Sequence, residues 1–523
     1  MKAQRLVLLL GVFVWAFILC TSFETFAATP AGEIKLTAPE WGHEIPIPRM
    51  ELGYSLDWLK LLYDPLFGAT PEGKLSPDYG LVVKWEMSPD GLTWTFYLRT
   101  GVKFHDGVEL TAKDVKFSLE QVMLPDSKTG NGGVFRQAIK SMEVKDPYTL
   151  VIQCKKPFLF LAEFLSDIEG MDIVIIPKDY YEKVGQDQFM KRPIGSGPYR
   201  WHSQMVGSYI KLESTGKKHW RDGVPQYKYM TYLLIPEESI RIAMLKTGEA
   251  DIAMVSREGV KDVLGAGMKV VPKQGDAMVC FYPNMQWTSP VFSDIRFRKA
   301  LNLAIDKEAI IKHILGGMGT PVATLPGNVA MTCGGDRKLK PYPYDPEQAK
   351  RLIKEGGYEG HEFDVPVYDR AEFPEYPKVA EAVLGYWQKI GLKPKILMTR
   401  FDAWRERWMA RKTQNTIMGV DTSVVPGCNG MLRTYEQKLY SKSPRTHVNL
   451  SYLDERIGKI LSSVNLEEVE KLTGEVYRYA YDQYLVVPIC DLNGVMAATK
   501  QIPVWDPGLR RRDGNYRRLI RQP

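Results

Sequence analysis

Cysteine is scarce in this chain of 523 residues: there are six, and no two have the CxxC spacing of a redox or zinc motif. Cys20 lies in an apolar N-terminal run, and the others are widely spaced, at Cys154, Cys280, Cys333, Cys428 and Cys490. The odd number beyond that run leaves at least one thiol unpaired, even in an oxidising compartment. Cys428 could pair with Cys280 or Cys333, or all could be small buried hydrophobic residues.

Motifs of the common enzyme classes are absent as well. The chain has no HExxH, GxSxG, Walker loop or GxGxxG, and its seven histidines lack the spacing of zinc or copper ligands. The glycine-rich segment 195–198 precedes neither a Lys-Ser nor a Lys-Thr pair, so it predicts a tight turn and not a phosphate loop. We therefore expect binding without catalysis, with no catalytic residues, no metal site and no cofactor.

Long hydrophobic runs are limited to one, at the N-terminus. It extends from Leu6 to Cys20, about 15 residues, which is short of the roughly 20 that span a bilayer. Basic residues precede it and small ones follow at Ala27 and Ala28, the plan of a secretory leader. We expect cleavage at Ala27 or Ala28 and export to the periplasm. Bulky residues precede Cys20, so we expect no lipid anchor there.

The composition is that of an ordinary globular protein, with 44% hydrophobic and 25% charged residues and a formal net charge of +7. The length predicts two or three domain-sized units. The C-terminus carries a basic run, made of Arg510, Arg511, Arg512, Arg517, Arg518 and Arg521. No nucleic-acid-binding motif surrounds this run, so we expect an exposed, mobile end and no nucleic-acid partner.

A β-hairpin followed by a capped helix is the clearest local pattern. Every second residue from 92 to 98 is apolar, which predicts a strand with one buried face: Leu92, Trp94, Phe96 and Leu98. Asp90-Gly91 and Asp106-Gly107 supply turns on either side of the extended pieces. Thr111 then stands three residues before Asp114, which predicts a capping box at the start of a helix. This region is expected to form a compact β-rich unit.

The second half alternates helices with strands. Asp294 and Asp345 are predicted to cap helices, and Pro377 to open a third before a strand at 395–398. This alternation predicts parallel βαβ units. Two strands are expected to flank Gly275-Asp276 as a first crossing between lobes. A later strand at 486–489 would return to the first lobe, so two crossings would form a hinge.

Several longer motifs occur in order along the chain, at 62–67 (LYDPLF), 75–80 (LSPDYG), 85–107, 193–199 (PIGSGPY), 294–307, 344–358 and 387–392. Together they resemble the family 5 extracellular solute-binding proteins of peptide and nickel ABC importers. The resemblance implies an α/β, two-lobed periplasmic-binding-protein fold of type II, with an extra β-rich subdomain in lobe I. The implied boundaries are a signal peptide at 1–28, lobe I at 29–275 with the subdomain at about 55–192, lobe II at 276–484, and a return to lobe I at 485–523.

The resemblance also implies a function. A monomeric receptor would capture a small solute, most conventionally an oligopeptide or dipeptide, and deliver it to ABC permease subunits at the membrane. An opine, a sugar derivative or a chelated metal is the alternative cargo within this class. An envelope chaperone of the same fold is a further alternative, and an extracellular hydrolase is a third class.

Candidate ligand contacts follow predicted strands, because the crevice of an open α/β sheet lies beyond the carboxyl ends of its strands. They are Glu40, Trp41, Asn284, Trp287, Arg400, Phe401 and Trp404, and the resemblance adds Asp421 as a further candidate. Arg400 could hold a carboxylate through two hydrogen bonds or could be a surface arginine.

Asp421 is the most interesting acid among these candidates. Peptide-binding members of the resembled family commonly carry a tryptophan, an aspartate and an Asp-Pro pair near this place, and the acid pairs with the α-amino group of the peptide. Here Val420 replaces the tryptophan, and Val425 precedes Pro426. Either Asp421 keeps the amine contact, or the amine site is lost.

Overall fold

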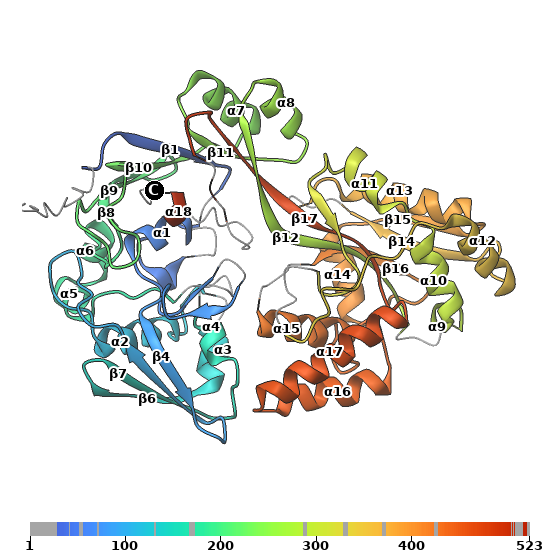
Figure 1. Ribbon diagram of the computed structural model, residues 1–523, viewed down its shortest axis with the longest axis horizontal. Coiled ribbons are helices and arrows are strands. Elements are labelled where there is room, and N and C mark those ends of the chain that lie inside the picture. The colour runs from blue at the N-terminus through green and yellow to red at the C-terminus, as the bar shows by residue number, and fades with distance from the viewer. Residues whose placement is uncertain are drawn as a thin grey trace, which may run out of the picture.

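The computed structural model describes residues 29–40, 42–51, 56–70, 73–129, 132–166, 173–285, 290–327, 333–368, 373–422, 427–503, 505, 507 and 516–519. These residues form two bodies joined by two long strands, β12 (Lys269–Pro283) and β17 (Val487–Ala498), which lie side by side (Figure 1). We call the described residues before β12 and after β17 lobe I, and those between the two strands lobe II.

One nine-stranded sheet extends through both lobes, in the order β16-β12-β17-β11-β1-β10-β9-β8, with β13 paired to β17. Its other strands are β1 (Glu33–Ala38), β8 (Tyr199–Met205), β9 (Tyr209–Ser214), β10 (Tyr229–Leu234), β11 (Ile252–Val255), β13 (Gly319–Pro321) and β16 (Ile417–Thr422). β1 is parallel to both of its neighbours, β10 and β11. The helices of lobe I outside the β-rich unit are α1 (Leu56–Leu62), α5 (Lys178–Val184), α6 (Gln186–Lys191), α7 (Glu238–Thr247), α8 (Val260–Gly265) and α18 (Tyr516–Leu519), with a short 3-10 helix at Pro48–Met50.

A β-rich unit is present within lobe I, but it is smaller than the expected range of about 55–192, because α1, α5 and α6 pack in the main core of lobe I. Its elements are β2 (Gly68–Ala69), β3 (Leu75–Ser76), β4 (Val82–Met87), β5 (Thr93–Leu98), α2 (Ala112–Val122), α3 (Gly132–Ala138), β6 (Ile139–Asp146), β7 (Thr149–Cys154) and α4 (Leu161–Phe164). Along β5, Trp94, Phe96 and Leu98 are buried while their neighbours are half-buried, as the alternation predicts. The capping box of Thr111 and Asp114 is confirmed at the start of α2.

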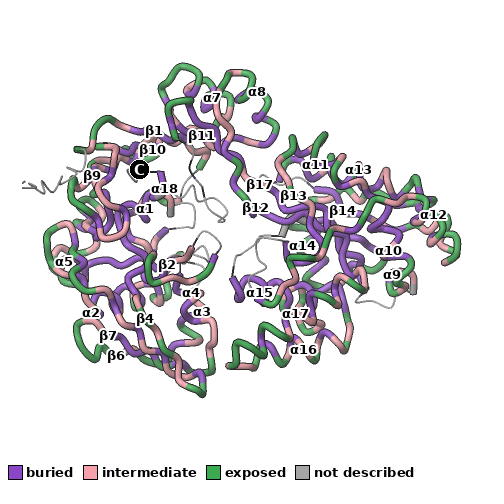
Figure 2. Tube along the Cα trace, viewed as in Figure 1, coloured by how far each residue is buried: buried purple, intermediate pink, exposed green. Residues whose placement is uncertain are grey.

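Lobe II confirms the predicted helix starts. Its elements are α9 (Pro290–Ser293), α10 (Ile295–Leu303), α11 (Lys307–His313), α12 (Pro346–Glu355), β14 (Glu362–Val367), α13 (Tyr376–Lys389), β15 (Lys393–Met398), α14 (Phe401–Met409), α15 (Cys428–Leu439), α16 (Ser451–Ser462) and α17 (Leu466–Asp482). Asp294 and Asp345 cap α10 and α12 through their carboxylates. β14 and β15 are parallel and α13 lies between them in sequence, so the βαβ prediction holds for this pair. Each lobe has its own buried interior (Figure 2).

The crossing at Gly275 differs from the prediction. Two separate strands were expected there, and the structure has one continuous strand, β12, whose pairing with β17 shifts register between Lys273 and Ala277. Gly275 has φ +72°, a conformation that glycine adopts without strain. The irregularity is therefore absorbed as a bulge and does not end the strand.

The glycine-rich segment 195–198 packs closely against the end of α1. A Cβ on Gly195 would lie 2.0 Å from the carbonyl oxygen of Leu62, and one on Gly197 would lie 2.3 Å from that of Leu61. The Gly197 N–H donates to the Leu62 carbonyl at 3.0 Å. Glycine is needed here because the end of α1 contacts this turn directly.

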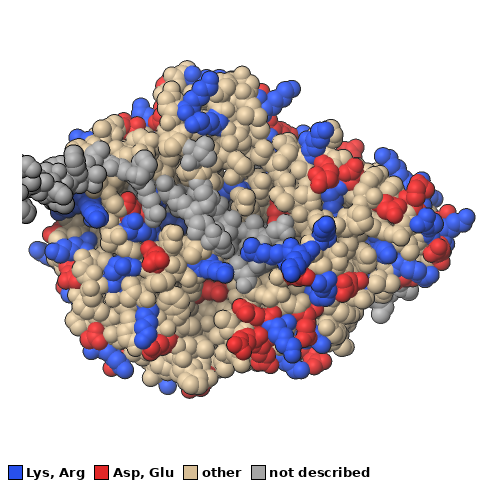
Figure 3. Space-filling model, in the orientation of Figure 1, with Lys and Arg blue, Asp and Glu red and all other residues tan. Residues whose placement is uncertain are grey.

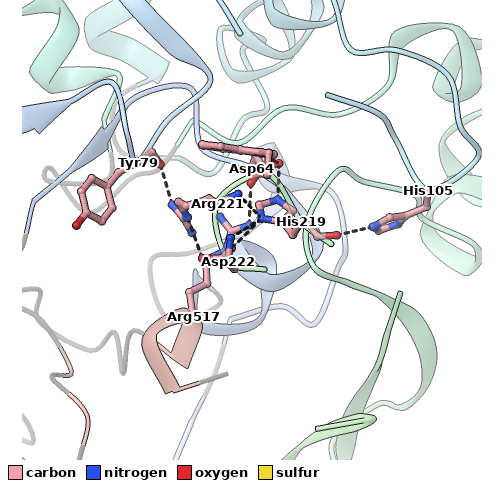
Figure 4. Close-up of polar contacts among 9 residues, drawn as sticks. Asp64, Tyr79, His105, His219, Arg221, Asp222 and Arg517 are labelled. Atoms are coloured by element: carbon pink, nitrogen blue, oxygen red, sulfur yellow. Dashed lines mark hydrogen bonds and ion pairs between the residues drawn. The ribbon is translucent and has the colours of Figure 1, made fainter. Parts of the chain in front are cut away.

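The C-terminal arginine run is not wholly an exposed end, which corrects the prediction. Arg517 on α18 is 5% exposed, and its guanidinium lies 2.7 Å from Asp64 Oδ1 and 3.1 Å from Asp222 Oδ2 (Figure 4). His219 lies between the same carboxylates, at 3.2 Å from Asp64 and 3.1 Å from Asp222. Two buried carboxylates require nearby cations, and the chain end supplies one of them. Arg510, Arg511, Arg512 and Arg521 lie outside the described residues.

One disulfide joins Cys333 to Cys428, which is one of the two pairings left open by the sequence. Cys154, Cys280 and Cys490 are buried free thiols. Within the described part of the chain, no helix combines the length and the apolar character needed to cross a bilayer.

Candidate ligand-binding site between the lobes

Asp421 lies near the carboxyl end of β16, on the strand next to β12. Its backbone pairs with Val279, and the following residue, Thr422, pairs with Met278. From Thr422 the chain leads through 423–426 to α15, which begins at Cys428. Asp421 thus lies on the sheet that joins the lobes, seven positions before the first residue of α15. The ligand contact of Asp421 stays a prediction.

The strand that carries Asp421 is tightly fixed from beneath. A Cβ on Gly419 would lie 2.5 Å from Phe281 Cε1 and 2.8 Å from the Tyr376 hydroxyl oxygen. The Tyr368 hydroxyl donates to the Gly419 carbonyl at 2.8 Å. The glycine of the Gly-Val-Asp-Thr segment is therefore a packing requirement, and it gives Asp421 a rigid base.

Asn284 is buried and turned inward. Its side-chain amide donates to the carbonyl of Thr413 at 2.8 Å and to the Thr413 hydroxyl at 2.7 Å, and its own N–H donates to Thr416 O at 3.1 Å. These bonds hold the loop that enters β16. Asn284 therefore supports the site from within the protein, and its ligand-contact prediction gains no support.

The three candidates at the start of α14 and on it have different environments. Trp404 is completely buried in the core of lobe II, which gives it a packing role. Phe401 is half-buried and its ring lies 5.1 Å from that of Tyr368. Arg400 is exposed at the start of the helix. Figure 3 shows Lys and Arg side chains over this part of lobe II, where α14 also carries exposed Arg405 and Arg407.

The remaining candidates are only partly placed. Glu40 is exposed directly beyond β1. Trp41, Trp287 and the cleavage residues Ala27 and Ala28 lie outside the described residues. The structure does not bring Asp421 and Asn284 together: Asp421 lies near the end of β16, opposite Val279, and Asn284 follows β12 beside the start of β16. Arg400 and Glu40 are exposed side chains just beyond strand ends.

A stack of rings in lobe II was missed from the sequence. The His447 ring stacks on Tyr282 at 4.9 Å and on Trp408 at 5.3 Å between centroids. The Lys438 ammonium lies 4.4 Å from the Trp408 ring and 5.0 Å from the Tyr282 ring. Burial, and then the Lys438 charge, hold the pKa of His447 well below its usual 6.5. These residues come from β12, α14, α15 and the loop after α15, so no local pattern could have grouped them.

A buried ion pair near the hinge was also missed. Arg257, directly after β11, lies 3.2 Å from Glu375 at the start of α13, and its Nε donates to the carbonyl of Asn493 on β17. Beside it, exposed Lys378 and Glu258 pair at 2.6 Å. These contacts join lobe I to lobe II next to the connecting strand. No group of His, Cys, Asp and Glu suited to a metal ion occurs within the described ranges.

Comparisons with known proteins agree with this architecture. The glutathione-binding protein GsiB of Salmonella choleraesuis (strain SC-B67) is 29% identical over 345 residues, which span 66% of this chain and 64% of that relative. HbpA2 from Haemophilus parasuis has a TM-score of 0.76 at 20% identity, covering 92% of this chain and 99% of its own. NikA from Brucella suis, in complex with Fe(III)-EDTA, has a TM-score of 0.74 at 19% identity, covering 94% of this chain and 100% of its own.

These two structures confirm the predicted two-lobed fold. A family model described as bacterial extracellular solute-binding proteins, family 5 Middle, matches residues 76–440, which is more than half of the chain. The chain therefore belongs to the bacterial extracellular solute-binding proteins of family 5.

Proposed function

We propose that this protein is the substrate-binding component of an ABC importer, which captures a small solute between its lobes and delivers it to permease subunits. One observation carries the proposal: in a family 5 chain, two lobes are joined through the paired strands β12 and β17. A solute that contacts both lobes stabilises the closed arrangement by its differential affinity for that state. A permease can then distinguish the loaded receptor from the empty one.

A short peptide is the cargo that we place first. The curated relative is named for glutathione, a tripeptide with a free amino group and two carboxylates. Asp421 would accept the amino group, and the exposed arginines around α14 would favour the carboxylates. A chelated metal is the second candidate, because the NikA neighbour was solved with Fe(III)-EDTA. Export by the N-terminal leader and action as a monomer belong to the same proposal.

Thermal unfolding tests this proposal. The leaderless protein is freed of co-purified solute by unfolding and refolding, and then heated with glutathione, di- to pentapeptides, opines, oligosaccharides or metal chelates. A bound solute at about a hundred times its Kd adds roughly 2.7 kcal/mol to the free energy of unfolding. We expect stabilisation by glutathione or a short peptide.

Asp421→Asn separates the amine contact from the receptor role. It removes the charge but keeps the shape, so stabilisation by peptides should fall while the unfolding temperature without solute stays close to that of the wild type. Stabilisation by a metal chelate alone would keep the receptor role and exclude a peptide cargo. Absence of stabilisation by every compound, together with affinity for unfolded chains, would favour the chaperone alternative.

A further inference from the structure

The lobes also meet far from the connecting strands, where α4 of lobe I faces α15 of lobe II (Figure 1). The backbone N–H of Asn429, the second residue of α15, donates to Glu163 Oε2 on α4 at 2.8 Å. The two residues are 266 positions apart in the sequence. The contact is therefore a tertiary link between the lobes.

α15 receives its N-terminal cap from the other lobe. Its own N-cap residue is Gly427, which has no side chain, and its first turn contains no acidic residue. The first N–H groups of a helix have no partner within the helix, and the helix dipole favours a negative charge beside them. Glu163 supplies both the acceptor and the charge. A helix of 12 residues thus depends on lobe I for this interaction.

Apolar contacts surround this polar link. Leu159 and Phe160, just before α4, pack against the hydrophobic core of lobe II. The hairpin turn at Gly91 also contacts lobe II, because a Cβ there would lie 2.7 Å from Val464 Cγ1 in the loop between α16 and α17. The β-rich unit of lobe I therefore contacts lobe II at a second place, separate from the Arg257–Glu375 pair beside the hinge.

The disulfide fixes the helix end that takes part. Cys428, the residue before Asn429, is bonded to Cys333. Gly334, which follows Cys333 in the sequence, lies so close to α17 that a Cβ on it would be 1.9 Å from the Glu470 carbonyl oxygen. The start of α15 is thereby tied to α17, and the Asn429 N–H is held in place for Glu163.

We propose that Glu163 and the N-terminus of α15 form a clasp that holds the rims of the lobes together in the solute-free protein. The Cys333–Cys428 disulfide keeps the helix end in register for the clasp. The hinge-side pair Arg257–Glu375 lies next to β17 and is displaced little when the lobes rotate, whereas the clasp must break before the rims can separate. In the receptor function proposed above, on which this point rests, opening of the lobes is then opposed by the clasp as well as by the bound solute.

Small-angle X-ray scattering of the solute-free protein tests the clasp. Glu163→Ala removes the acceptor and its charge, and we expect the ratio of open to closed molecules to rise roughly tenfold, the change for a charge-assisted hydrogen bond of ordinary strength. The radius of gyration should increase accordingly. The matched control is Glu182→Ala, which removes an exposed glutamate that pairs with Lys178 inside lobe I and should leave the scattering unchanged.

Two further variants keep the test decisive. Glu163→Gln keeps the shape of the side chain and an acceptor oxygen but removes the charge, so it should open the lobes less than Glu163→Ala does, and it decides the case if Glu163→Ala fails to fold. Cys333→Ser combined with Cys428→Ser should also increase the radius of gyration, and adding Glu163→Ala to it should give little further opening. A scattering curve of folded Glu163→Ala that matches the wild type, or of Glu163→Gln if the alanine variant does not fold, would overturn the proposal.

Discussion

Replacing Arg517 by Ala should destabilise lobe I far more than the position of this residue near the chain end suggests. Asp64 and Asp222 have no exposed side-chain surface, and Arg517 contacts both carboxylates. Burial works to raise the pKa of Asp64, yet His219 and Arg517 hold it below its usual range. Asp222 is likewise held low, by Arg221 and Arg517 against the effect of burial. Both carboxylates therefore remain charged and lose one of their cations in the variant.

The expected loss follows from this geometry. Removing one partner of a buried ion pair costs about 3–5 kcal/mol, because the other charge stays buried without compensation. His219 and Arg221 remain near the carboxylates and moderate the loss, so we expect the lower part of that range. Arg200→Ala is the control, because its pair with Glu213 is exposed and should contribute less than about 1 kcal/mol.

Urea unfolding followed by far-UV circular dichroism measures both variants. A chain truncated after residue 515 should lose at least as much stability as Arg517→Ala, since it also removes the buried side chains of Tyr516 and Leu519. If Arg517→Ala lost no more stability than Arg200→Ala, the end of the chain would not be part of the lobe I core, and the reasoning would be wrong.

Three other predictions rest on local geometry and charge. Gly195→Ala should destabilise the protein by about 2 kcal/mol or more in urea unfolding, because the added Cβ would lie 2.0 Å from the Leu62 carbonyl oxygen. The control Gly265→Ala should be neutral, because its added Cβ would have nothing within 4 Å. Equal effects of the two substitutions would contradict the packing argument. Burial lowers the pKa of His105 to about 4 in the folded protein, whereas in the unfolded chain it is about 6.5. Between these pH values the unfolded chain binds a proton that the folded protein does not bind. Up to roughly 3 kcal/mol of the free energy of unfolding is therefore lost as the pH falls from 6.5 to 4. The thermal stability of His105→Gln should vary less with pH over this range, and that of a control at exposed His202 should vary as in the wild type. Burial works to lower the pKa of His219, but Asp64 and Asp222 raise it above its usual value. The charged His219 therefore stabilises the fold fully below pH 6.5, and this stabilisation is lost as the pH rises through the folded pKa. His219→Gln should be most destabilising at acid pH, and a larger effect at pH 8 than at pH 6 would contradict that sign.

Local patterns predicted much of the fold. The alternation at Trp94 and Phe96 and the capping residues Thr111 and Asp345 each depend on neighbours a few positions away, and all are confirmed. These signals are reliable because periodicity and capping are satisfied within one element.

Contacts between residues far apart in the chain could not be predicted from the sequence. Arg517 and Asp64 are 453 positions apart, and nothing near either residue indicates the other. Trp404 looked like a ligand contact because it follows a strand, but α14 turns it into the core of lobe II. Gly275 was expected to separate two strands, because a glycine can either end a strand or form a bulge within it. The pairing of β12 with β17 on both sides of Gly275 makes it a bulge. Asp421 was chosen from its segment and stays a prediction, while the close packing of Gly419 on the same strand could be seen only in the structure.

Isothermal titration of the refolded, solute-free protein with glutathione and short peptides, with analysis of the solution for products, tests the central claim most directly. The account predicts saturable binding of one solute per chain, recovery of that solute unchanged, and weaker binding of a peptide by Asp421→Asn. Conversion of the solute into a product, or the absence of one-to-one binding to glutathione, every peptide, opine, oligosaccharide and metal chelate, would contradict it.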